Sequence, residues 1–158
     1  STIMWEGKGL SFFKVGLLWS FAIAVEIILF LKLDRYFKSK FLFKALFFCS
    51  VIAFVRWTLT YLVDNFYALL IVQTLHGVTF ALTHYIMIFF INTKIKESSR
   101  LFVQSIYYTL TGGFFITILT ISCGHITSYT KGDEGYLLMS LLALFSFLIL
   151  YYKRKVLK

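Results

Sequence analysis

The sequence predicts an all-α integral membrane protein, and three observations carry that prediction. Apolar and aromatic residues make up 59% of the 158 residues and charged residues only 15%, whereas a soluble domain carries about 45–50% apolar and 25% charged residues. Phenylalanine alone occupies 19 positions. Long apolar runs alternate with short basic segments. This pattern argues against a soluble enzyme, a secreted disulfide scaffold and a disordered tail.

Five apolar stretches are the predicted spans, since a helix that crosses a bilayer needs about 20 residues. They cover residues 15–31, 45–63, 66–91, 103–122 and 136–152. The first and last are short and need a turn from their flanks, while the third is long enough to tilt. Helices satisfy their own backbone hydrogen bonds in hydrocarbon. We therefore predict one transmembrane domain over residues 1–158, with five helices and no soluble domain.

The basic residues predict the orientation of these spans. Twelve of the 16 fall on one predicted side: Lys32, Arg35, Lys38, Lys40, Lys44, Lys94, Lys96, Arg100, Lys153, Arg154, Lys155 and Lys158. Only Lys8, Lys14 and Lys131 fall on the other side. The positive-inside rule makes the richer side cytoplasmic, which puts the C-terminus inside. The net charge of +9 then reflects topology and contact with anionic lipid, and we predict no nucleic-acid partner.

Four ionisable residues lie within the predicted spans, where such groups are costly and mark candidate sites. At about 1.5 Å per residue, Arg56 lies roughly 10 Å and His76 roughly 15 Å from one face of the bilayer. Glu26 and His84 lie at similar distances from the other face. The sequence therefore predicts an Arg56/His76 layer near the midplane and a Glu26/His84 layer nearer the cytoplasm.

Further polar residues share helix faces with these groups. In the third span a spacing of three and four residues places several on one stripe, and the fourth span has a polar face of its own. The substrate-pathway candidates are Gln73, Thr79, Thr83, Gln104, Tyr107, Tyr108 and Thr111. The chain contains no proline, so the adjacent Gly112 and Gly113 are the predicted hinge of the fourth span.

Simpler interpretations stand beside the functional ones. The histidines could be hydrogen-bond partners between helices, Glu26 a neutral packing residue, and the two glycines a packing contact. Arg56 could stack on Trp57 or snorkel, although pairing suits its depth better. Phosphate-binding loops, CxxC and HExxH are absent from the sequence, so we predict no enzyme, no cofactor and no metal site.

Several segments resemble the C-terminal half of a major facilitator superfamily permease. The resemblance is to the proton-symporter branch that contains the lactose, nucleoside and phenylpropionate permeases. It is carried by GKGLSFFKVGLLWSFAIAVEIILF (7–30), LKLDRYFKSKF (31–41), FVRWTL (54–59), LLIVQTLHGVTFALTHYIMIFF (69–90) and VQSIYYTLTGGFF (103–115). The arginine–tryptophan and Gln-x-Leu-His pieces, in order on adjacent spans, are the most specific part.

The resemblance implies that residues 1–5 end a seventh helix and that the five spans are helices eight to twelve. It implies a partner half of six helices, with a small organic solute bound between the halves near mid-membrane, in a bacterial inner membrane. Arg56 and His76 inherit a proton-coupling role, with Glu26 and His84 as further candidates. Thr79 stands where the family has a glutamate. Asp34 and Arg35 would form a cytoplasmic gate loop.

Two functions follow from this resemblance. The first is secondary active transport, with proton-coupled symport of a small organic solute. The alternative is a truncated or split half that has no activity alone and serves as a membrane partner or structural subunit. An unrelated small membrane scaffold would instead tolerate apolar residues at its intramembrane charges.

Overall fold

Every regular element in the described part of the chain is a helix. The computed structural model describes residues 2–37, 42–130 and 132–153. The elements are α1 (Thr2–Gly7), α2 (Phe12–Tyr36), α3 (Leu42–Leu62), α4 (Phe66–Lys94), α5 (Glu97–Tyr108), the π-helix η2 (Thr109–Phe115), α6 (Ile116–Thr130) and α7 (Gly135–Lys153). Five segments are long and apolar enough to cross a membrane, with α5, η2 and α6 forming one of them. The predicted fold class is confirmed.

Most of the helices are longer than the apolar stretches that predicted them. Helix α2 begins at Phe12, where the Ser11 side chain accepts a hydrogen bond from the backbone of Lys14. Asn65 caps α4 in the same way. Backbone hydrogen bonding continues past the last apolar residue, so α2 runs to Tyr36. The predicted gate loop of Asp34 and Arg35 is therefore wrong in one respect, because both residues belong to the last turn of α2.

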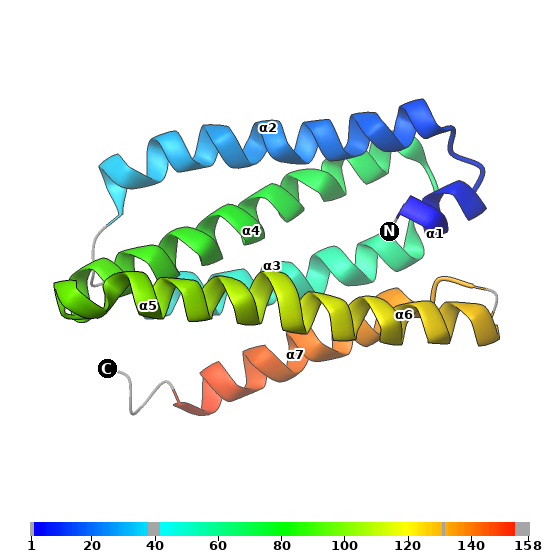
Figure 1. Ribbon diagram of the computed structural model, residues 1–158. Helices are drawn as coiled ribbons and strands as arrows, with labels where there is room; N and C mark the ends of the chain where they lie inside the picture. Colours follow the sequence, from blue (N-terminus) through cyan, green and yellow to red (C-terminus); the bar gives the residue numbers. More distant parts are fainter. Residues whose placement is uncertain (1, 38–41, 131, 154–158) are drawn as a thin grey trace.

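The helices of the bundle lie in a spatial order that differs from their order in the chain. Helix α4 packs between α2 and α3, and α7 packs on the far side of α3 (Figure 1). Helices α2 and α4 run in the same direction, whereas α3 runs opposite to both and also opposite to α7. This arrangement brings residues of α2, α3 and α4 together in the middle of the bundle.

The segment α5–η2–α6 lies across the front of the bundle in Figure 1 and packs more loosely than the other spans. None of its residues is buried. Gly112 and Gly113 both lie in η2, and a Cβ on either would meet open space. A π-helical stretch is rare and interrupts the regular hydrogen-bond ladder. The predicted hinge therefore coincides with an irregularity of the helix, although hinge motion stays a prediction.

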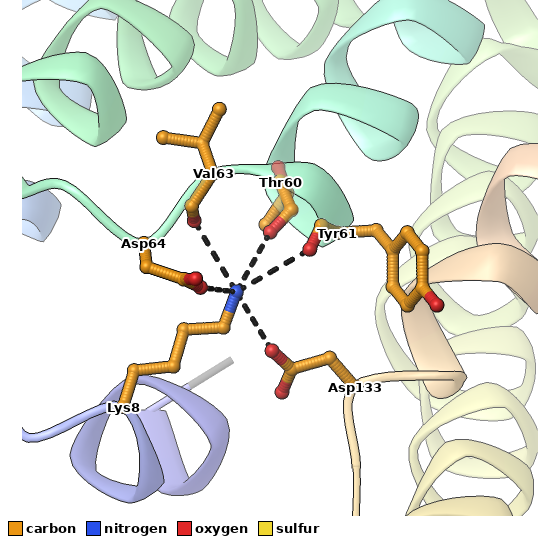
Figure 2. A network of polar contacts seen from close by, with 6 residues as sticks. All are labelled: Lys8, Thr60, Tyr61, Val63, Asp64 and Asp133. Atoms are coloured by element: carbon orange, nitrogen blue, oxygen red, sulfur yellow. Dashed lines mark hydrogen bonds and ion pairs between the residues drawn. The ribbon is translucent and has the colours of Figure 1, made fainter.

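One ammonium group ties together three connections at one end of the bundle, which we call the Lys8 end. The Lys8 Nζ atom lies 2.8 Å from Asp64 Oδ1 and 2.7 Å from Asp133 Oδ2 (Figure 2). It also donates to the carbonyl oxygens of Thr60, Tyr61 and Val63 at 3.4, 3.5 and 3.2 Å. Lys8 thereby caps the end of α3, whose last carbonyl groups have no partner within the helix.

Lys8 holds its charge in this setting. Burial by itself lowers the pKa of the ammonium group, but the hydrogen bonds and charges of Asp133 and Asp64 outweigh burial, so the pKa is raised. The side chain of Lys8 is only 9% exposed. The same end of the bundle holds an apolar cluster of Trp5, Leu10, Val15, Leu18 and Leu69.

The opposite end of the bundle collects most of the basic residues within the described part of the chain, while Lys14 lies at the Lys8 end and Arg56 lies within α3. Those at the opposite end lie at or near helix ends: Lys32, Arg35, Lys44, Lys94, Lys96, Arg100 and Lys153. Six other basic residues of the orientation argument lie outside the described residues: Lys38, Lys40, Lys131, Arg154, Lys155 and Lys158. The segregation of charge along the bundle matches the predicted one where it can be seen.

Candidate functional site

Three ionisable side chains from three different helices meet in the interior of the bundle. Arg56 on α3 is hydrogen-bonded through a terminal guanidinium nitrogen to His76 Nδ1 on α4. The other ring nitrogen, Nε2, lies 3.6 Å from Glu26 Oε1 on α2. The side chains of His76 and Glu26 are only 21% and 16% exposed. We call Glu26, Arg56 and His76 the charged triad.

The chemistry of the guanidinium group decides the tautomer of His76. Arginine has only N–H donors and no acceptor, so His76 Nδ1 must accept the hydrogen bond. The neutral ring then carries its proton on Nε2, which faces Glu26. The 3.6 Å separation is slightly longer than a hydrogen bond, and a small movement of the carboxylate closes it. Glu26, His76 and Arg56 thus lie in one line, with Arg56 as a fixed donor at one end and the Glu26 carboxylate at the other.

Arg56 both pairs and stacks, which joins two interpretations that the sequence left apart. Its guanidinium carbon lies 3.9 Å from the ring centroid of Trp57, and Trp57 stacks in turn on Tyr136 of α7 at 5.9 Å. The Nε atom of Arg56 is shut off from solvent and has no hydrogen-bond partner in the described structure. The guanidinium therefore keeps unused donor capacity inside the bundle.

Gly77 allows the close helix crossing beside the triad. A Cβ at this position would lie 2.7 Å from Val25 Cγ1, 2.8 Å from Val25 Cβ and 3.0 Å from the carbonyl oxygen of Ala22. Any larger side chain at residue 77 would push α2 away from α4. Since Val25 precedes Glu26 and Gly77 follows His76, the absent side chain sets the distance between these two triad members.

A second polar cluster lies further along α4 and contains His84. Its Nδ1 atom is 3.3 Å from the Tyr107 hydroxyl, and its Nε2 atom is 3.0 Å from the Tyr108 hydroxyl. A neutral imidazole has one donor and one acceptor, so each hydroxyl can satisfy one nitrogen. The Phe80 ring lies between His76 and His84, stacked at 6.0 Å from the first and 6.1 Å from the second. It separates the two clusters.

The predicted pairing of layers is wrong for Glu26. The Glu26 carboxylate lies beside His76, in the triad with Arg56, and not beside His84. The ring of His84 instead contacts the ring of Phe30 on α2, with 6.0 Å between the ring centroids.

Helix length does not account for this difference, because Glu26 and His84 lie the same number of residues from the ends of α2 at Tyr36 and α4 at Lys94. The relative shift of the two helices and the side-chain direction decide the pairing. Val25 lies against Gly77 and Phe30 against His84, and helical side chains lean toward the N-terminus of their helix, so the Glu26 carboxylate faces His76.

The pathway candidates have different surroundings. Gln73 is buried, and its Nε2 atom has no partner in the described structure. Thr79 is buried and bonds to carbonyls of its own helix, as does Thr111. Thr83 contacts the thiol of Cys49 on α3. Gln104 is partly exposed on α5. Tyr107 and Tyr108 join the cluster of His84, and the Thr111 side chain contacts the Tyr107 hydroxyl.

Several aromatic contacts of the site were not predicted from the sequence. Trp19 meets the His76 ring edge-on at 5.8 Å, and Phe80 stacks between the two histidines. The spacing of His76, Phe80 and His84 by four residues was a usable signal, because residues at i and i+4 lie on one face of a helix. Trp19 carried no such signal, since its contact depends on the packing of α2 against α4.

Comparison with known proteins identifies relatives of this chain. The family model described as "MFS_1 like family" matches residues 2–132. A curated protein of Escherichia coli (strain K12), the "Probable 3-phenylpropionic acid transporter", is 28% identical over 144 residues. That alignment covers 91% of this chain and 38% of the relative, so the chain spans well under half of that protein's length. No solved structure matches the chain.

Proposed function

Because the chain belongs to the MFS_1-like family of transporters, we propose that it forms part of a secondary transporter that moves a small organic solute together with protons. The observation that carries the proton-coupled part is the charged triad. Ionisable groups inside a membrane bundle are expensive, and pairs or chains of them mark ion and proton pathways. Glu26 and His76 both exchange protons, whereas Arg56 stays charged and can hold an anionic partner.

We propose further that the chain works with an N-terminal half of six helices. Transporters of this kind bind substrate between two halves near the bilayer midplane, and the triad lies near the middle of its own bundle. The resemblance to one half of such a transporter supports this pairing, and the alignment covers 38% of the relative. The second cluster of His84, Tyr107 and Tyr108 would extend the pathway along α4, and Gly112 and Gly113 in η2 would let the fourth span bend.

The charge distribution supports an orientation for this transporter. We place the Lys8 end outside and the lysine-rich opposite end in the cytoplasm, as the positive-inside rule requires. The C-terminus is then cytoplasmic, and the membrane is a bacterial inner membrane. Labelling of single cysteines with a membrane-impermeant maleimide tests this placement. The cysteines are introduced as Lys14→Cys or Lys94→Cys in a background that carries Cys49→Ser and Cys123→Ser. Labelling of residue 94 by reagent added outside intact cells would show that the orientation is the opposite one.

Uptake into proteoliposomes tests the transport proposal. The chain is reconstituted with a co-expressed N-terminal half of the Escherichia coli relative, and 3-phenylpropionate, the solute in that relative's name, is the first solute. We expect accumulation driven by an inward proton gradient and loss of accumulation in His76→Ala. Lys94→Gln, which removes a positive charge far from the triad, serves as the matched control. Accumulation that ignores the proton gradient would rule out proton coupling.

The alternative is a half with a structural role and no transport of its own. Under it, the chain co-purifies with an N-terminal half, and the complex shows no uptake with any of a panel of organic acids, sugars and nucleosides. Substitution of Arg56 and His76 by leucine would then leave the complex intact. Gradient-driven uptake of any of these solutes, lost on that substitution, would contradict a purely structural role.

A further inference from the structure

We propose that Arg56 is the binding group for the carboxylate of an organic-acid substrate, and that Glu26 takes up one proton for each anion bound. This inference rests on the proposed transport function and deepens it. It assigns the substrate to a chemical class, the monovalent carboxylates, and assigns different tasks to the members of the charged triad. Transport would then be electroneutral, with one proton for one anion.

The first support is that Arg56 has no acidic partner in the described part of the protein. The described ion pairs join Lys8 to Asp64 and Asp133, and the Glu26 carboxylate faces the neutral ring of His76 instead of Arg56. Arg56 instead donates to the neutral ring of His76, and its Nε has no partner. A buried charge without a counter-charge is unfavourable. The guanidinium fork matches a carboxylate with two parallel hydrogen bonds, which is the partner that this site lacks.

The second support is the charge balance inside the bundle. With Glu26 ionised and Arg56 protonated, the charged triad is neutral overall. An added carboxylate would leave one uncompensated negative charge in a medium of low dielectric constant, which is costly. A proton on Glu26 restores neutrality. The surrounding side chains are Trp19 on α2, Phe80 on α4, and Trp57, which stacks on Tyr136, and none of them supplies a charge near neutral pH.

The third support is the position of His76 between the anion-binding and proton-binding groups. In the empty site the guanidinium occupies Nδ1, so the ring cannot accept a proton there. An anion that takes the guanidinium donor frees Nδ1. The ring can then accept a proton at Nδ1 and release the one on Nε2 to Glu26 Oε1, 3.6 Å away. The ring ends neutral and the carboxylate gains one proton, so the step balances and links anion binding to proton uptake.

Calorimetric titration of the 158-residue chain in lipid nanodiscs tests this proposal. The probes are 3-phenylpropionate and its neutral amide, 3-phenylpropionamide, which has nearly the same shape. We expect the acid to bind at least about tenfold more tightly than the amide, because a site built for a charged group rejects an analogue that lacks it. Titrations in two buffers with different heats of ionisation give the number of protons taken up, and we expect one per anion.

Variants separate the two tasks. Arg56→Gln should abolish the preference for the acid, whereas Arg56→Lys, which keeps the charge, should retain part of it. Glu26→Gln should still bind the acid but with no proton uptake. Lys94→Gln should behave as the wild type. Circular dichroism checks the fold of each variant, and the comparison of acid with amide in the wild type needs no variant at all.

The outcomes distinguish this inference from the transport proposal. No binding of the acid by the folded chain, equal affinity for acid and amide, an acid preference that survives Arg56→Gln, or proton uptake that survives Glu26→Gln would each overturn it. Anion binding at Arg56 with proton uptake, in a chain whose complex shows no gradient-driven accumulation, would instead support this site and contradict the transport function.

Discussion

Replacement of Gly77 by alanine tests the closest helix contact beside the charged triad. The added Cβ would lie 2.8 Å from Val25 Cβ, whereas ordinary contacts begin at 3.4 Å. A rotamer change can move the Val25 methyl groups but not its Cβ, nor the Ala22 carbonyl at 3.0 Å. Helix α2 must therefore retreat from α4 by about 0.6 Å, the difference between the two Cβ distances.

This displacement acts directly on Glu26 and His76, which adjoin the contact in sequence. Their 3.6 Å separation would rise past 4 Å and break the contact. Overpacking costs about 1–3 kcal/mol, while alanine regains up to about 1 kcal/mol of helix propensity over glycine. We expect Gly77→Ala to lower the free energy of unfolding by up to about 2 kcal/mol, the remainder of these two effects.

Two measurements check this expectation in lipid. Nitrogen-15 spectra of the labelled chain report the ring of His76, whose signal should shift, and titration with SDS reports unfolding. Gly16→Ala is the matched control, because it lies on α2 and its Cβ would meet nothing within 4 Å. If Gly77→Ala leaves both the His76 signal and the unfolding curve of the wild type unchanged, the inferred role of this crossing is refuted.

Three further predictions concern the remaining features of the bundle. Lys8→Met should lower the free energy of unfolding by about 1–3 kcal/mol, which is less than the cost of breaking a fully buried ion pair because Asp64 is exposed. The control variant Lys14→Met should change the free energy of unfolding little. The pKa of Lys8 is raised from 10.5, so the wild type should be more stable than Lys8→Met by a constant amount below about pH 10.5. This difference in unfolding free energy should shrink as the pH rises through the raised pKa. A difference that stays constant to pH 12 would contradict the charged state of Lys8. The double variant Gly112→Ala/Gly113→Ala should stabilise the fourth span by up to about 1 kcal/mol per site, because the added methyl groups meet no clash. It should also narrow the distribution of distances between two spin labels placed on either side of η2. An unchanged width of this distribution would argue against a hinge. His84→Leu should release α5 from α4 and so increase the rate of amide hydrogen exchange in α5. Exchange rates equal to those of the wild type would show that the contacts of His84 with the two tyrosines do not hold α5 in place.

The fold class and the spans could be predicted from the sequence because they depend on composition and on local periodicity. A run of about 20 apolar residues has few alternatives to a membrane helix. The helix ends were harder to predict, since a helix continues as long as its backbone is hydrogen-bonded, whether its side chains are apolar or not. That difference moved Asp34 and Arg35 from a loop into α2, whereas the pairing of Glu26 with His76 depends on the shift of α2 along α4.

The sequence by itself determined which residues carry unusual chemistry. Glu26, Arg56, His76 and His84 stand out because charge inside an apolar span is costly wherever the helix packs. The sequence also placed Arg56 and His76 at one level, but the partner of Glu26 was decided only by the tertiary structure. Whether a carboxylate faces one histidine or the other depends on the relative shift of α2 and α4, and that shift depends on the close approach at Gly77. Likewise, Lys8 is an ordinary loop lysine in the sequence, and only the packing of three connections around its ammonium group makes it a buried ion pair.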